Sequence, residues 1–330
     1  MLEYHMRIKG TGRRLPTIPI PNSDFVTRNL YSYKPDGTRA LLEGRTEEKI
    51  LETTGIAMRY KAFGHGSLAA MAYGAAEQAL SRAGVAAREL DGIIVATLGA
   101  NENIPSIACQ VQKHLGVSTK NAFDINNACA GFPTALKTAY LHAAFDGGMQ
   151  RYLIIGAERL TAYVDEDDIN SILFGDGAGA AVVETADVND EGRILAFYSS
   201  TDSSNGNCDL IYRDAQGKLR MPYGNRVFRP AVNAISTAAS IVREELNWTD
   251  KPIAVIPHQA NRRITSEVKS RLKPGDKVYD NIARYGNMSA ATCIIALDGA
   301  LETGFVEKGD RVILSTFGAG TVTSAVAIQY

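Results

Sequence analysis

Short apolar segments alternate with helical segments along the whole chain, and this alternation limits the possible folds more than any other feature. Residues 93–97, 152–157 and 253–256 are apolar runs, which are typical of strands buried on both faces of a sheet. Small and apolar residues recur at helical spacing between such runs, most clearly over 68–83, where Gly84 ends the helix. The pattern predicts an α/β fold with helices packed on a sheet.

The alternation occurs in both halves of the 330-residue chain. Each half places buried strands beside a helix of small residues, which suggests an internal duplication, although no clear sequence repeat accompanies it. We therefore expect two similar halves, residues 1–185 and 186–330. Other expected features are a short strand at 6–8 followed by a Gly/Pro-rich turn, an irregular surface excursion at 22–44, a loop over a pocket at 199–226, and helices at 47–54, 105–115, 230–246, 262–272 and 289–301.

Composition argues against several classes of protein. The chain is 45% hydrophobic and 22% charged with a net charge of -1, which gives no electrostatic reason to expect nucleic acid or a membrane as a partner. No apolar run approaches the roughly 20 residues that span a bilayer, and the N-terminus lacks the apolar core of a signal peptide. Four cysteines without CxxC pairs or zinc-ligand spacing indicate a reduced, metal-free, cytoplasmic protein.

One cysteine, Cys129, occupies a position that favours reactivity. It lies in residues 127–132 (NACAGF), where an expected strand turns into a helix. Unpaired backbone N–H groups and the positive end of the helix dipole favour a thiolate on such a first turn. Small neighbours leave room for a substrate to approach the sulfur. A buried structural cysteine is the alternative when this residue is considered alone.

Two polar loops offer partners for Cys129. His258 follows the apolar run 253–256, and ligands bind beyond the carboxyl ends of such strands in open α/β sheets. Asn287 lies in a glycine turn before the expected helix 289–301. Taken singly, His258 fits a hydrogen-bonded structural histidine and Asn287 a turn residue or helix cap. Together with Cys129, however, they form a set that a known family shares.

Five segments in chain order resemble the β-ketoacyl-acyl-carrier-protein synthase III family. They are residues 127–132 (NACAGF), 174–182 (FGDGAGAAV), 257–264 (PHQANRRI), 285–291 (YGNMSAA) and 317–320 (FGAG). The similarity extends from Gly10-Thr11-Gly12 to the C-terminal strand. It implies a thiolase-like α/β fold, in which two similar halves form a five-layered αβαβα core, and usually an obligate homodimer.

The resemblance also implies a mechanism. Cys129 would attack an acyl thioester to form an acyl-enzyme, while backbone N–H groups of Cys129 and Ala319 hold the oxyanion. His258 and Asn287 would bind the thioester oxygen of malonyl-acyl carrier protein and stabilise the enolate left when carbon dioxide departs. That carbanion would attack the acyl-enzyme to give a β-ketoacyl thioester, in fatty acid or specialised, polyketide-like biosynthesis. No tightly bound cofactor is implied, because coenzyme A or carrier-protein phosphopantetheine carries the substrate.

Further residues take expected roles from the same resemblance. Ile104 and Phe317 would line the acyl pocket, and Ile104 lies in a segment, 102–106, that reaches across the dimer in the family. Met221, Gly224 and Asn225 would line the pantetheine tunnel. A basic patch would dock the acidic acyl carrier protein, although a solvated helix face is the alternative for each member. This patch comprises Arg262, Arg263, Lys269, Arg271 and Lys273.

Some positions depart from the family pattern. Housekeeping members have a tryptophan that stacks on the adenine of coenzyme A and an arginine beside it, where this sequence has Lys49 and Thr53. An aromatic platform worth roughly 1–3 kcal/mol is therefore missing, which favours an acyl donor bound to carrier protein. Ala319 replaces a glycine, and Ile104 replaces a common aromatic residue. These departures favour a specialised member of the family.

Three other functions are compatible with parts of this pattern. Acyl transfer without carbon–carbon bond formation has no need of Asn287 as an enolate donor. Condensation of two β-ketoacyl units would use an extra acid or base, for which Glu158 is the candidate, with a structural carboxylate as the alternative. A non-catalytic binding module is disfavoured because nucleophile, histidine and asparagine are all present. Condensation with malonyl-acyl carrier protein is the leading hypothesis.

Overall fold

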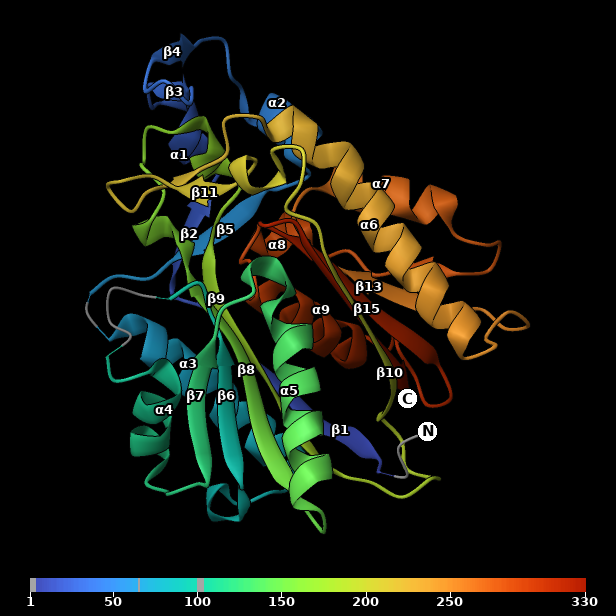
Figure 1. The fold of residues 1–330 in the computed structure, drawn as a ribbon. Coiled ribbons are helices and arrows are strands. Elements are labelled where there is room, and N and C mark those ends of the chain that lie inside the picture. Colours follow the sequence, from blue (N-terminus) through green and yellow to red (C-terminus); the bar gives the residue numbers. More distant parts are fainter. Residues whose placement is uncertain (1–3, 65, 100–103) are drawn as a thin grey trace.

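The structure is a computed structural model that describes residues 4–64, 66–99 and 104–330 (Figure 1). Its main sheet takes five strands from each half of the chain. The first half contributes β1 (Met6–Arg14), β6 (Gly92–Ala96), β7 (Asn121–Ile125), β8 (Arg151–Arg159) and β9 (Asp176–Thr185). The second half contributes β10 (Arg193–Thr201), β13 (Ala254–Pro257), β14 (Lys277–Val278), β15 (Arg311–Gly318) and β16 (Val322–Gln329).

The two sets of strands are arranged in the same order. The sheet reads β14-β13-β15-β16-β10-β1-β9-β8-β6-β7, so in each half the first strand lies beside the fifth, followed by the fourth, second and third. Parallel pairs occur at equivalent places, since β6 pairs with β7 and β8, and β13 pairs with β14 and β15. The halves join where β1 meets β10 in antiparallel pairing. This repeated order supports our proposed division near residue 185.

The strands of each half form one layer. Helices on the two outer sides and between the halves bring the number of layers to five (Figure 1). α3 (Ser67–Ala83) and α4 (Ile107–Leu115) pack on the outer face of the first half, and α6 (Gly224–Glu245) and α7 (Arg262–Arg271) lie on the outer side of the second. α5 (Gly131–Asp146) and α9 (Ala291–Glu302) form the middle layer, because each contacts strands of both halves. The shorter α8 (Ile282–Tyr285) precedes α9.

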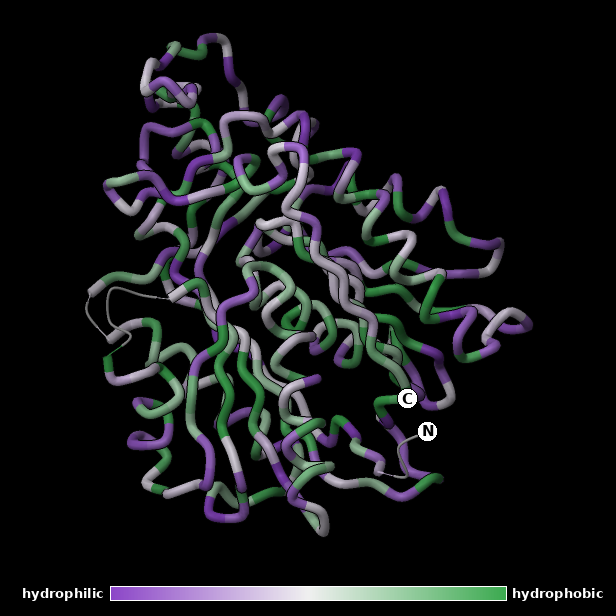
Figure 2. The backbone as a smooth tube through the Cα atoms, in the orientation of Figure 1, coloured by the Kyte–Doolittle hydropathy of each residue, from purple (hydrophilic) through white to green (hydrophobic). Residues whose placement is uncertain are grey.

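The largest hydrophobic core surrounds the middle layer. It includes Phe132 and Leu136 of α5, Leu297 of α9, and strand residues such as Ile154 and Val326. Figure 2 shows the same distribution, with hydrophobic residues along the central strands and hydrophilic residues at the outer turns. Within the residues described, no helix is both long and apolar enough to cross a membrane. The predicted helices 47–54 and 68–83 are confirmed as α2 (Glu47–Thr54) and α3.

The prediction of a turn after residue 8 was wrong, because β1 continues to Arg14. A Cβ atom on Gly10 would lie 2.6 Å from the backbone nitrogen of Ala83, and one on Gly12 would lie 2.6 Å from the carbonyl oxygen of Ala75. The glycines therefore allow α3 to pack directly on the strand. They mark close packing of two elements rather than a reversal of the chain.

The segment 22–44 is also more regular than expected. It contains α1 (Ser23–Val26) and a hairpin of β3 (Leu30–Tyr33) and β4 (Arg39–Leu42). Two short strands flank this segment in the sequence, β2 (Ile18–Pro21) and β5 (Met58–Lys61), and they pair with each other.

The segment 199–226 forms a loop region with a small hairpin of β11 (Tyr212–Arg213) and β12 (Leu219–Arg220). The next helix, α6, begins at Gly224 and continues through Pro230, where the sequence predicted its start. The proline removes one helical N–H donor, and the packing of α6 on β15 and β16 outweighs that loss.

Candidate active site

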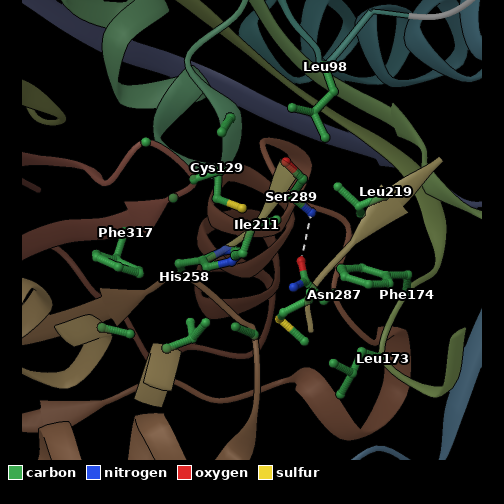
Figure 3. Close-up of a pocket in the computed structure, with 18 of the residues that line it drawn as sticks. Leu98, Cys129, Leu173, Phe174, Ile211, Leu219, His258, Asn287, Ser289 and Phe317 are labelled. Carbon is green, nitrogen blue, oxygen red and sulfur yellow. Dashed lines mark hydrogen bonds between the residues drawn. The ribbon is translucent and has the colours of Figure 1, made fainter. Parts of the chain in front are cut away.

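A cavity of about 720 Å³ lies where the N-termini of α5 and α9 meet (Figure 3). Its wall contains Cys129, His258 and Asn287, which come from three segments far apart in the sequence. Figure 3 shows the three side chains directed toward one common space. The structure thus brings the three predicted residues together at one site.

Cys129 is held by a strained turn. It lies in a 3-10 turn, Ala128–Ala130, that leads from β7 into α5. Ala128 has a φ of 47°, a left-handed conformation that is uncommon for residues other than glycine and often marks a functional site. The loop after β15 packs on this turn so closely that a Cβ on Gly318 would lie 2.8 Å from the backbone nitrogen of Cys129. Ala319, the predicted oxyanion residue, follows directly and lines the cavity.

Asn287 is oriented by its neighbours. Its backbone N–H donates to the carbonyl of Leu173 at 2.8 Å, and its own carbonyl accepts from Gly175 at 3.0 Å. The side-chain oxygen of Asn287 accepts the backbone N–H of Ser289 at 2.8 Å, as the dashed line in Figure 3 shows. Because the oxygen is occupied, the amide NH₂ group is the end of this side chain left to serve as a donor.

His258 has a defined tautomer in the resting site. The hydroxyl of Thr292 donates to the carbonyl of Ser289 at 2.8 Å, and its oxygen lies 2.6 Å from Nδ1 of His258. Since the only hydroxyl hydrogen serves Ser289, His258 must donate its Nδ1–H to Thr292. The second ring nitrogen, Nε2, therefore carries a lone pair. This arrangement leaves Nε2 of His258 able to accept a proton.

The charge state of the pair differs from the predicted thiolate. Burial raises the pKa of Cys129 to about 12 and lowers the pKa of His258 to about 4. Desolvation disfavours the charged form of both groups at once, and His258 is only 3% exposed. The resting pair is therefore a neutral thiol and a neutral imidazole at pH 7.

One side of the cavity is apolar. Leu98, Leu160 and Phe174 surround it together with neighbours from the loop segment 199–226, namely Ile211 and Leu219. The opposite side is formed by α6 and α7 residues such as Val227, Phe228 and Ile264. Both walls are therefore hydrophobic, and we call the first the apolar arm and the second, formed by α6 and α7, the tunnel arm. Sequence reasoning missed the apolar arm because its residues come from separate segments that share no motif.

The segment 199–226 is tied to the loop after β15. The backbones of Asp202 and Thr321 exchange two hydrogen bonds of 2.9 and 3.0 Å, and the thiol of Cys208 donates to the carbonyl of Gly320 at 3.1 Å. The predicted loop over a pocket is thus found as part of the cavity wall.

Only some of the remaining predicted site residues line the cavity. Phe317, Met221 and Gly224 line the cavity, and Phe317 packs in the hydrophobic cluster of α6 and α7. Asn225 is exposed and lies outside the cavity wall, as does Ile104, which is 94% exposed. Within the segment 102–106, Glu102 and Asn103 fall outside the described residues. The basic patch is exposed on α7 and just beyond it, at Arg262, Arg263, Lys269, Arg271 and Lys273.

The positions that lack the aromatic platform lie beside α7. Lys49 donates to the carbonyl of Gly44 at 2.8 Å, and the backbone carbonyl of Thr53 accepts from the side chain of Asn261 at 3.0 Å. Both are on α2, next to the tunnel arm, since Asn261 lines the cavity. Over residues 4–64, 66–99 and 104–330, no group of three His, Cys, Asp or Glu side chains is arranged to hold a metal ion.

Solved structures with the same fold identify the class of protein. A 3-oxoacyl-[acyl-carrier-protein] synthase III from Aquifex aeolicus is 37% identical and covers 98% of this chain and 100% of its own, with a TM-score of 0.86. The priming β-ketosynthase from the R1128 polyketide biosynthetic pathway is 30% identical, covers 98% and 96%, and has a TM-score of 0.83. The predicted thiolase-like fold is confirmed. The protein is a condensing acyltransferase of this fold.

Sequence comparisons place the chain within that class. Models of 3-oxoacyl-[acyl-carrier-protein (ACP)] synthase III match residues 123–203 and, for its C-terminal part, residues 244–330. β-Ketoacyl-[acyl-carrier-protein] synthase III of Desulfotalea psychrophila is 37% identical over 98% of this chain and 99% of its own length. The enzyme of the same name from Serratia proteamaculans is 34% identical over 99% and 100%. The chain belongs to the 3-oxoacyl-[acyl-carrier-protein] synthase III family.

Proposed function

We propose that the enzyme transfers an acyl group from a thioester to Cys129 and condenses it with malonyl-acyl carrier protein, releasing carbon dioxide and a β-ketoacyl thioester. One observation carries the assignment to these residues. Cys129, His258 and Asn287 meet at one cavity, and the amide NH₂ group of Asn287 is left free to donate. A donor of that kind serves a developing enolate oxygen, whereas simple acyl transfer has no such oxygen to hold.

Cys129 attacks the acyl thioester as His258 accepts its proton at Nε2. The backbone N–H groups of Cys129 and Ala319 hold the oxyanion, and the close packing of Gly318 on the cysteine turn keeps the two segments together. The carrier thiol leaves as a thiolate and takes a proton from solvent. The acyl chain then occupies the apolar arm.

Malonyl-acyl carrier protein reacts in the second step. Asn287 donates to the thioester oxygen. The malonyl carboxylate raises the pKa of His258 from its resting value of about 4, so that the imidazolium donates to the same oxygen. Loss of carbon dioxide leaves an enolate whose carbon attacks the acyl-enzyme. The expelled Cys129 thiolate recovers its proton from His258, which restores the resting site. Burial of the site protects the carbanion from protonation by water.

Substrates are thioesters of phosphopantetheine, with no tightly bound cofactor. The tunnel arm admits the pantetheine along Met221 and Gly224, and the exposed basic patch on α7 docks acyl carrier protein. Lys49 and Thr53 offer no aromatic surface to adenine, which supports carrier protein over coenzyme A as the acyl donor. The similarity to a polyketide priming β-ketosynthase supports a specialised as well as a fatty acid pathway.

We further propose a cytoplasmic homodimer. β7 lies at the edge of the sheet, and an open edge strand invites pairing with another chain. Exposed hydrophobic side chains on and after α5 add to this face, with Phe145 90%, Met149 61% and Leu141 53% exposed. Ile104, which is also exposed, would enter the acyl pocket of the partner subunit.

Intact-protein mass spectrometry tests the assignment. Wild type, Cys129→Ala and Asn287→Ala are mixed with acyl-coenzyme A and acyl-carrier-protein donors, followed by malonyl-acyl carrier protein. We expect an acyl adduct on wild type and Asn287→Ala but not on Cys129→Ala, and discharge of the adduct roughly 100–1,000-fold slower in Asn287→Ala. An adduct that persists in Cys129→Ala, or discharge to free acid, would contradict the proposal.

A further inference from the structure

Glu158 is a buried carboxyl group beside the reaction centre that the proposed mechanism does not use. It lies near the end of β8 and is only 1% exposed. The backbone N–H of Leu98 donates to it at 3.2 Å and that of Ala290, just before α9, at 3.4 Å. Burial outweighs these donors and the positive charge of Arg213, and raises the pKa of Glu158 to about 8. The group is therefore mostly protonated at pH 7 and can itself donate a hydrogen bond.

Ser289 lies between this carboxyl group and the nucleophile. Its hydroxyl is within reach of both Glu158 and the Cys129 sulfur, and Figure 3 shows its side chain beside Cys129. Yet among the described residues the buried hydroxyl oxygen has no hydrogen bond of ordinary geometry. A buried polar group without a settled partner costs free energy and calls for an explanation.

The backbone conformation of Ser289 is also unusual. Its φ of 44° is left-handed, a conformation that costs roughly 1–3 kcal/mol in a residue other than glycine. The turn is nevertheless fixed, because the N–H of Ser289 donates to Asn287 and its carbonyl accepts from Thr292. The strained turn thus keeps the Ser289 side chain beside Cys129.

We propose that Ser289 donates a hydrogen bond to the Cys129 sulfur as negative charge develops there, and that Glu158 is a positioning residue that holds the Ser289 hydroxyl group. This role rests on Cys129 being the nucleophile of the proposed function. The carboxyl O–H satisfies the acceptor side of the hydroxyl, so that the hydroxyl hydrogen faces the thiolate. Hydrogen bonds to a charged partner are the stronger ones.

The titratable and charged groups that face Glu158 are Cys129, from the turn before α5, and Arg213, from β11. When Glu158 loses its proton, it can no longer donate to Ser289, and it also places a negative charge near the sulfur. Both changes disfavour the thiolate. The reactivity of Cys129 should therefore depend on a second ionisation near pH 8.

The test measures the rate at which iodoacetamide alkylates Cys129 between pH 6 and pH 10. Peptide mass spectrometry separates Cys129 from the exposed Cys109 and Cys208. The variants are Ser289→Ala, Glu158→Gln, which keeps a donor without a charge, and the double variant. Asp124→Asn is the matched control. Asp124 is a partly buried carboxylate that accepts two backbone hydrogen bonds, each 2.8 Å long, and it is not part of the cavity wall.

We expect Ser289→Ala to slow alkylation roughly tenfold at pH 7, which is the size expected for losing a hydrogen bond to a charged group. Glu158→Gln should match wild type below pH 8 and exceed it above, whereas Asp124→Asn should follow wild type throughout. The gain of Glu158→Gln should be smaller in the Ser289→Ala background, where only the direct effect of the Glu158 charge on the sulfur remains.

Alkylation of Ser289→Ala at the wild-type rate would overturn the proposal, as would a Glu158→Gln profile that follows wild type to pH 10. Because iodoacetamide needs no acyl substrate, these outcomes are distinct from a failure of the condensation itself.

Discussion

Thr292 has one hydroxyl hydrogen and two buried neighbours that can use it, the carbonyl of Ser289 and Nδ1 of His258. Its choice of Ser289 determines that His258 presents a lone pair to the cavity. No motif in the sequence indicates this role, because threonine in the first turn of a helix commonly bonds to a preceding carbonyl for purely local reasons. The tautomer of His258 therefore depends on a contact that only the folded chain creates.

Thr292→Val tests this contact, because it removes the hydroxyl group and leaves the shape of the side chain nearly unchanged. We expect acyl loading of Cys129 to slow about 10–100-fold, because the buried Nδ1–H loses its acceptor at a cost of roughly 1–3 kcal/mol. Thr292→Ser, which keeps the hydroxyl, should load within a few-fold of wild type. Single-turnover mass spectrometry of the acyl adduct measures both rates. Equal rates for Thr292→Val and wild type would show that another group sets the tautomer.

The sequence predicted that Cys129, His258 and Asn287 belong to one site, because together they match segments of a known family, and the structure brings them to one cavity. It misjudged the resting charges, because the helix N-terminus that favours a thiolate is itself buried and desolvation acts more strongly. The apolar arm could not be predicted either. Leu98, Ile211 and Leu219 share a wall only because distant segments fold over the same cavity.

At the scale of elements, helices and buried strands were predictable where apolar spacing and a terminal glycine agreed. α3 and α4 end at Gly84 and Gly116, both in the left-handed conformation. The glycines inside β1 led to the wrong prediction of a turn, since the sequence does not distinguish a glycine needed for a turn from one needed for close packing. Gly12 is an example, with the α3 backbone directly above it.

Gly12→Ala should therefore destabilise the protein by about 1–3 kcal/mol, because the added methyl group would lie 2.6 Å from backbone atoms of Ala75 and Ala79. Gly74→Ala in the facing helix is the control. There the methyl group meets only the flexible side chain of Arg14, and alanine improves helix propensity. Thermal unfolding should show a lower Tm for Gly12→Ala and an equal or higher Tm for Gly74→Ala. The reverse order would mean that β1 and α3 are not tightly packed.

At the scale of the whole molecule, the exposed face around β7 and α5 predicts the assembly state. Phe145→Asp should convert a dimer into a monomer, because it places a charge among exposed apolar side chains that we expect a partner to bury. Light scattering after size-exclusion chromatography measures the mass directly. Leu41→Asp, at a residue 45% exposed on β4, which is a strand outside the main sheet, should leave the mass unchanged. A monomeric wild type would refute the proposed dimer.

The repeated strand order also bears on how such an enzyme arose. Ala128 and Ser289 both adopt left-handed conformations just before the middle-layer helices α5 and α9, so they occupy corresponding places in the two halves. In an ancestor made of two identical copies, both turns would have had the same residues. Had the halves descended from such an ancestor, divergence would have left the proposed nucleophile, Cys129, in one copy and the proposed amide donor, Asn287, in the other. Neither half of the gene could then lose its turn without loss of the whole reaction, which gives selection a reason to preserve the fused pair.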